Sequence, residues 1–126
     1  MQERPLSPHI QIYKPQLTSA LSIMHRMTGL LLSLGLMGMS LWLIALSTGE
    51  KPYALWLTIA GNILARILLV VWTWSFYYHL CNGVRHLLWD SGHGLEISAV
   101  YRSGYLALGA SVVLTGLTWL MLAAAG

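Results

Sequence analysis

The sequence is poor in charged residues and almost free of cysteine. Only 9% of its 126 residues are charged, whereas an ordinary soluble domain carries about a quarter. Together with a hydrophobic content of 56%, this excludes an ordinary soluble domain and indicates an integral membrane protein. The one cysteine, Cys81, has no partner in the chain, which excludes an internal disulfide framework and an iron–sulfur cluster with four cysteine ligands.

Concentrated charge and an N-terminal apolar segment are also missing. The net charge of +3 comes from basic residues that are scattered beside the apolar runs, so we do not expect nucleic acid as a partner. The first twenty residues hold three of the four prolines and no apolar run, so no signal peptide is expected. On composition alone this segment is either irregular structure on one membrane face or a disordered tail.

Long apolar runs are what the sequence does contain. Residues Met27–Leu46 carry no charge, and about twenty helical residues span the roughly 30 Å hydrocarbon core. A second run, 53–84, is interrupted only by Arg66 and is too long for one straight span, so its first part is expected to lie at the interface. We therefore predict an all-α integral membrane protein whose three transmembrane helices lie at about 22–47, 63–89 and 104–125.

The third span carries small residues at every fourth position, a spacing that lets helices approach closely. Basic residues gather before the first span and around the loop between the second and third, whereas Lys51 alone lies in the loop between the first and second. The positive-inside rule then predicts a cytoplasmic N-terminus and, after three spans, an external C-terminus.

Polar residues share one face near the end of the second span. His79 is followed at helical offsets of three, four and seven by Asn82, Gly83 and His86, which places them in one stripe. Polar side chains at membrane depth are costly and usually face a bundle interior, a cofactor or water. Gly83 leaves room between the histidines for a flat group such as haem.

The two histidines of this stripe cannot ligate one iron, because they lie about 10.5 Å apart along the helix. His25 is expected at the cytoplasmic mouth of the first span, level with His86, so a haem held by His79 would need its second ligand from another polypeptide. Two alternatives remain open. The histidines could simply hydrogen-bond to neighbouring helices, or they could line the proton path of a small channel or transporter subunit.

A second group of polar residues opens the first span. Ser22 and Arg26 are four residues apart, and His25 is adjacent. An arginine beside a hydroxyl can donate to a quinone oxygen, a lipid phosphate or a haem propionate, and His25 could relay a proton. The alternative is that Arg26 is only a basic anchor at a cytoplasmic helix end.

Three motifs, taken in order along nearly the whole chain, suggest a family. They are RPLSPHIQIY at 4–13, SIMHRMTG at 22–29 and HLCNGVRHLLWD at 79–90. The sequence thereby resembles the cytochrome b556 subunits of succinate dehydrogenase, the membrane anchors of respiratory complex II. The resemblance implies that the three helices form part of a multi-subunit bundle in the bacterial inner membrane, with a periplasmic C-terminus.

The resemblance also implies roles for particular residues. His79 would be an axial ligand of a haem b shared with a second anchor subunit, and Ser22 and Arg26 would bind ubiquinone. His25, Arg26 and His86 would be haem-propionate or proton-relay neighbours. Structural or interface positions are expected at Arg85, Trp89, Asp90, Pro8 and His9.

The remaining implications concern the partners. Residues 1–21 would pack on the cytoplasmic iron–sulfur subunit, and residues 22–126 would form the anchor. Succinate oxidation itself would belong to the flavoprotein subunit, and electrons would pass through the iron–sulfur subunit to quinone. A haem-free structural anchor is the remaining alternative to this interpretation, and a spectrum together with a quinone reductase assay would distinguish the two.

Overall fold

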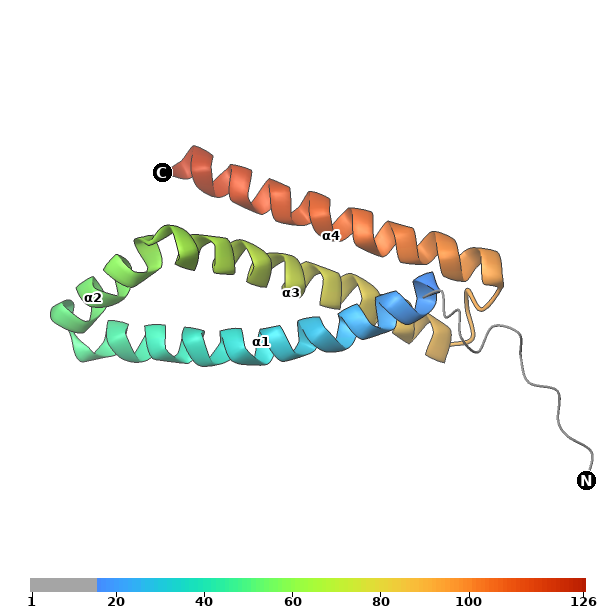
Figure 1. Ribbon diagram of the computed structural model, residues 1–126, viewed down its shortest axis with the longest axis horizontal. Coiled ribbons are helices and arrows are strands. Elements are labelled where there is room, and N and C mark those ends of the chain that lie inside the picture. Colours follow the sequence, from blue (N-terminus) through green and yellow to red (C-terminus); the bar gives the residue numbers. More distant parts are fainter. Residues whose placement is uncertain (1–15) are drawn as a thin grey trace, which may run out of the picture.

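The computed structural model describes residues 16–126, which form four α-helices and no strand (Figure 1). The helices are α1 (Leu17–Thr48), α2 (Glu50–Gly61), α3 (Ile63–Asp90) and α4 (Ile97–Ala125). Within this range α1, α3 and α4 are long and apolar enough to cross a membrane. The predicted all-α fold with three membrane spans is confirmed.

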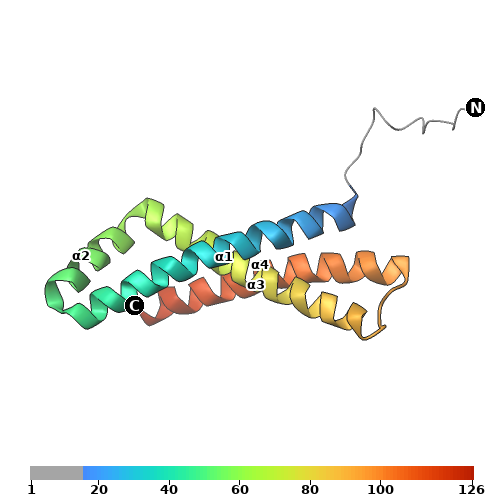
Figure 2. The same cartoon turned by 90° about the horizontal axis from the view of Figure 1, so that it is seen from below.

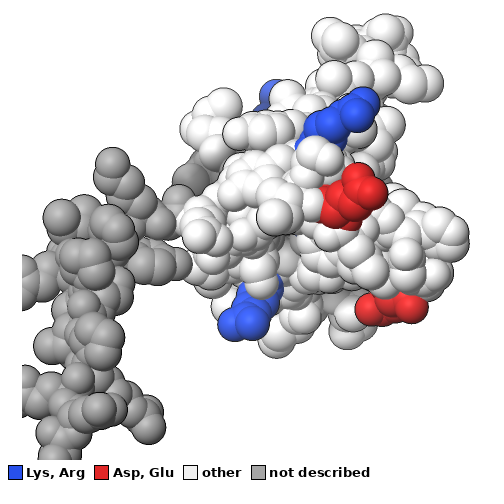
Figure 3. Space-filling model, turned by 90° about the vertical axis from the view of Figure 1, so that its right-hand side faces the viewer, with Lys and Arg blue, Asp and Glu red and all other residues white. Residues whose placement is uncertain are grey.

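The three long helices lie lengthwise beside one another, with α3 in contact with both α1 and α4 (Figures 1 and 2). The short α2 joins α1 to α3 at one end of the bundle, near the C-terminus (Figure 1). The start of α1 and the loop between α3 and α4 lie at the other end. There the visible charged side chains are few and stand apart on a mostly uncharged surface (Figure 3).

The helices extend beyond the apolar runs from which the spans were predicted. α1 begins at Leu17 instead of 22, and α4 at Ile97 instead of 104, because a helix can continue through the polar interface on its own backbone hydrogen bonds. The expected interfacial segment before the second span is the separate helix α2. Gly49 alone separates α1 from α2, with a φ of 130° that side chains disfavour.

Little apolar surface is buried within residues 16–126. In this range the buried hydrophobic residues are Leu21, Tyr78 and Ala107, whereas most large aliphatic side chains are exposed. Such a surface suits contact with lipid or with other membrane helices. The buried residues of α4 are Gly104, Ala107, Ser111 and Thr115, so the small-residue face predicted from the sequence is the one that packs inward.

Candidate functional site

Three histidines from two helices meet near the end of the bundle that holds the α3–α4 loop. The His25 ring of α1 stacks on the His79 ring of α3, with centroids 3.9 Å apart and planes at 8°. The His86 ring lies 5.4 Å from His25 at a tilt of 46°. His25 therefore bridges the two histidines of the α3 stripe, and all three form one cluster.

The sequence placed His25 level with His86 and found nothing on the first span level with His79. The first part agrees with the 5.4 Å between the His25 and His86 rings, but the second was wrong, because His25 stacks on His79. Two axial imidazoles approach one iron from opposite sides of the haem, and face-to-face stacking does not provide that arrangement. A haem on His79 still requires a second ligand from elsewhere, but depth is no longer the reason.

The hydrogen bonds of His79 define the state of its ring. Nδ1 lies 3.1 Å from the carbonyl oxygen of His25 and 3.3 Å from the hydroxyl of Thr28. A carbonyl oxygen can only accept, so Nδ1 carries the hydrogen. In the neutral ring Nε2 then keeps its lone pair, which is the form of histidine that binds a metal.

Two glycines shape the space around this imidazole. A Cβ placed on Gly29 would lie 3.1 Å from His79 Cε1, so a side chain at this position would press on the imidazole ring. At Gly83 a Cβ would have no neighbour within 4 Å among residues 16–126. The position beside Gly83 is therefore open within the described part of the chain.

Arg85 joins α3 to α4 and also contacts Asn82 on its own helix. Arg85 is buried, and its guanidinium donates to Ser103 Oγ at 2.9 Å, to the Val100 carbonyl at 2.8 Å and to Asn82 Oδ1 at 3.2 Å. Asn82 is fully buried and does not face the space beside the histidines as the stripe suggested. Trp89 donates its indole N–H to the Gly94 carbonyl. Arg85 thus links α3 to α4, Trp89 links α3 to the following loop, and Asp90 is exposed.

Ser22 and Arg26 line one shallow hollow at the start of α1. Its volume is about 340 Å³, and its other lining residues are Thr18, Ser19 and Ile23. Arg26 is exposed and Ser22 partly buried, so the guanidinium and up to three hydroxyl groups can reach a molecule held there. The predicted pair is therefore brought together, and Thr18 and Ser19 are additions that the motif did not indicate.

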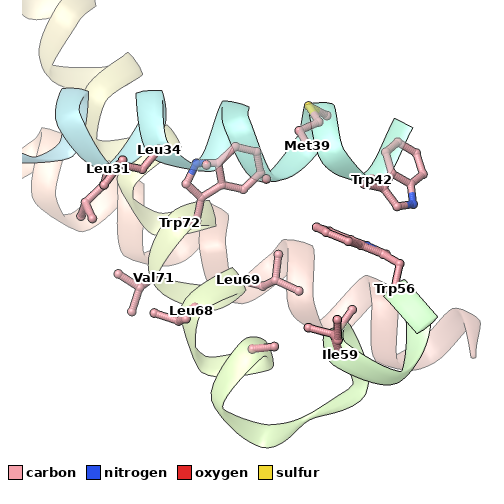
Figure 4. Close-up of a pocket in the computed structure, with 14 residues that line it drawn as sticks. Leu31, Leu34, Met39, Trp42, Trp56, Ile59, Leu68, Leu69, Val71 and Trp72 are labelled. Carbon is pink, nitrogen blue, oxygen red and sulfur yellow. The ribbon is translucent and has the colours of Figure 1, made fainter. Parts of the chain in front are cut away.

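A larger apolar cavity of about 620 Å³ lies between α1, α2 and α3, among residues toward the α2 end of the bundle. Trp42 and Trp56 approach each other near α2, and the Trp72 indole lies against α1 (Figure 4). The histidine cluster, Ser22 and Arg26 do not line this cavity. It is thus separate from the cluster and the hollow described above.

Sequence reasoning missed some residues of the site. Thr28 and Gly29 belong to the quoted motif SIMHRMTG, but they were assigned no role. Tyr78, fully buried, donates its hydroxyl to the Leu21 carbonyl at 2.7 Å, and thereby ties α3 to α1 one residue before His79. Thr28 lies three residues after His25, a spacing that could have placed it on the same face. Pro8 and His9 lie outside the described residues.

Known proteins match this chain over most of its length. The family of succinate dehydrogenase/fumarate reductase transmembrane subunits matches residues 1–118. The succinate dehydrogenase cytochrome b556 subunit of Rickettsia prowazekii (strain Madrid E) is 44% identical over 117 residues, which cover 93% of this chain and 91% of the relative. The succinate dehydrogenase cytochrome b556 subunit of Paracoccus denitrificans is 40% identical over 115 residues, which cover 91% of this chain and 88% of the relative. The resemblance seen in the motifs is confirmed, and the chain belongs to the succinate dehydrogenase/fumarate reductase transmembrane subunit family.

Proposed function

We propose that this chain is a cytochrome b anchor subunit of succinate dehydrogenase that holds haem b through His79 and helps to bind ubiquinone. The observation that carries the haem assignment is the hydrogen bond from His79 Nδ1 to the His25 carbonyl. It leaves Nε2 as the free nitrogen of the ring. A haem ligand commonly donates its other ring N–H to a backbone carbonyl in this way.

The surroundings of His79 fit a flat group. Gly83 leaves open space on the same face of α3, and His25 and His86 stand beside it. When bound, the haem supplies one-electron redox chemistry. His25, Arg26 and His86 are proposed to hold its propionates or to relay protons. The second axial ligand is proposed to come from a second anchor subunit.

The hollow beside Ser22 and Arg26 is the proposed quinone site. A guanidinium and a hydroxyl are donors, and a quinone carbonyl is an acceptor, so the pair can hold and polarise one carbonyl. The side chain of Ile23 supplies an apolar contact in the same hollow. Electrons from succinate would reach this site from the flavoprotein subunit through the iron–sulfur subunit.

The relatives named above are subunits of an oxidoreductase complex in the membrane. Three apolar helices and bacterial relatives support a multi-pass protein of the inner membrane. We propose that its N-terminus is cytoplasmic and its C-terminus periplasmic, and that residues 1–21 pack on the iron–sulfur subunit. The match to the family does not favour the small channel or transporter subunit considered from the sequence.

Haem ligation is tested with two histidine variants of the assembled complex. His79→Ala should change the coordination state of the haem in absorption and electron paramagnetic resonance spectra, because it removes the ligand. His86→Ala is the matched control from the same face of α3 and should retain six-coordinate haem. A colourless wild-type complex, or exchanged phenotypes of the two variants, would overturn the assignment.

A further inference from the structure

We propose that Thr28 is a positioning residue that fixes the hydrogen of His79 on Nδ1 and thereby presents Nε2 to the haem. This inference rests on the proposed function of His79 and names the residue of this chain that prepares it. Thr28 lies on α1 with 2% of its surface exposed, so water does not compete for its hydroxyl group.

The hydroxyl of Thr28 makes two contacts, and the first determines the second. It donates its single hydrogen to the His25 carbonyl at 2.9 Å. Toward His79 Nδ1, 3.3 Å away, the oxygen therefore has only lone pairs to offer. While it donates to that carbonyl, Thr28 can accept from Nδ1–H but cannot also donate to a bare Nδ1.

The His25 carbonyl adds the second acceptor at 3.1 Å from the same nitrogen. A neutral His79 with its hydrogen on Nε2 would set the lone pair of Nδ1 against the His25 carbonyl oxygen, and Thr28 could donate to that nitrogen only by giving up its hydrogen bond to the carbonyl. That tautomer is disfavoured, since buried acceptors without a donor are costly. Gly29, one residue further along α1, allows the imidazole to approach this pair of acceptors.

The test compares Thr28 variants in the assembled complex. Thr28→Val keeps the shape and removes the acceptor, whereas Thr28→Ser keeps a hydroxyl. Thr115→Val is the control, because Thr115 is a buried threonine of α4 whose hydroxyl bonds only to the Ser111 carbonyl within residues 16–126. The readout is the fraction of reduced haem that binds carbon monoxide, which competes for a loosened axial position.

We expect this fraction to rise about tenfold in Thr28→Val. Loss of a residue that orients a metal ligand usually changes metal affinity or activity by about 10- to 100-fold. The lower end of that range applies here, because the His25 carbonyl still accepts from Nδ1. Thr28→Ser and Thr115→Val should behave as wild type. Wild-type behaviour of Thr28→Val would overturn the inference while leaving His79 as ligand. An unaltered spectrum in His79→Ala would instead refute the proposed function itself.

Thr28→Ala provides a second test if the valine variant does not assemble. An increase in carbon monoxide binding in this variant would support the positioning role. Failure of both Thr28 variants to assemble, while His79→Ala assembles without its ligand, would show that Thr28 acts only in packing. That result would overturn the inference.

Discussion

The guanidinium carbon of Arg85 lies 4.0 Å from the centre of the Trp89 indole ring, one helical turn further along α3. The same guanidinium donates to Ser103 and to the Val100 carbonyl on α4. A cation over an aromatic face is attracted by the ring, so Trp89 holds the arginine where it joins the two helices. Arg85 is therefore a structural link between α3 and α4.

Replacing Arg85 by leucine should destabilise the α3–α4 pair. The change removes three hydrogen bonds and leaves Asn82 Oδ1 buried without its donor. We expect a loss of about 3 kcal/mol in the free energy of unfolding, measured as a lower melting temperature of the purified complex. Arg102→Leu is the control, because Arg102 is exposed on α4. Equal melting temperatures in the two variants would contradict the structural role.

A second prediction concerns the contact between α1 and Trp72. A Cβ on Gly35 would collide with the Trp72 indole ring, whereas a Cβ on Gly38 would meet nothing within 4 Å in the described part of the chain. Gly35→Ala should cost about 1 to 3 kcal/mol by overpacking. Gly38→Ala should be neutral or slightly stabilising, since alanine favours helix.

Both glycine variants are compared by thermal denaturation of the complex. The two sites lie on the same helix, so a difference between them reports the contact with Trp72 and not helix propensity. A loss of stability in Gly38→Ala equal to that in Gly35→Ala would show that a partner chain or lipid fills the space beside Gly38.

Membrane orientation gives a third prediction. Arg4, Lys14, Arg26 and Arg102 belong to the proposed cytoplasmic side, against Lys51 and Arg66 on the other. Arg85 is not included in this comparison of basic residues, because its side chain is buried between α3 and α4. The positive-inside rule still favours a cytoplasmic N-terminus. Reporter fusions at Gly49 and at Gly126 should both read as periplasmic, and a cytoplasmic signal at either position would contradict the proposed orientation.

The fold class and the meeting of Ser22 with Arg26 were accessible from the sequence for simple reasons. Uncharged runs of about twenty residues report membrane spans directly. Residues four apart on one helix are neighbours whatever the rest of the chain does. Both predictions depend only on local geometry.

The contacts of His25 were not accessible in the same way. Its position opposite His79 depends on where α1 starts and on how α1 lies against α3, and neither is encoded in a spacing along one helix. Asn82 shows the same limit, since its place on the stripe suggested the space beside the histidines but its amide oxygen accepts from Arg85. Contacts between helices required the structure.

The last prediction concerns the proposed quinone site. Charge-assisted hydrogen bonds contribute about 1.5 to 3 kcal/mol, so Arg26→Leu should slow quinone reduction by roughly tenfold to a hundredfold. Arg26→Lys should restore only part of the rate, because an ammonium keeps the charge but loses the planar fork. Ser22→Ala should show a smaller defect, since it removes one neutral donor.

The measurement is quinone reductase activity divided by the amount of flavin in the purified complex, which corrects for assembly. Reduction of an artificial dye by the soluble subunits is the control and should be unchanged, because it bypasses the hollow at the start of α1. If Arg26 were only a basic anchor, Arg26→Leu would lower the amount of complex but not its turnover. Unchanged turnover per flavin in both Arg26→Leu and Ser22→Ala would therefore exclude the pair from quinone binding, whereas a graded loss would place the quinone carbonyl between their side chains.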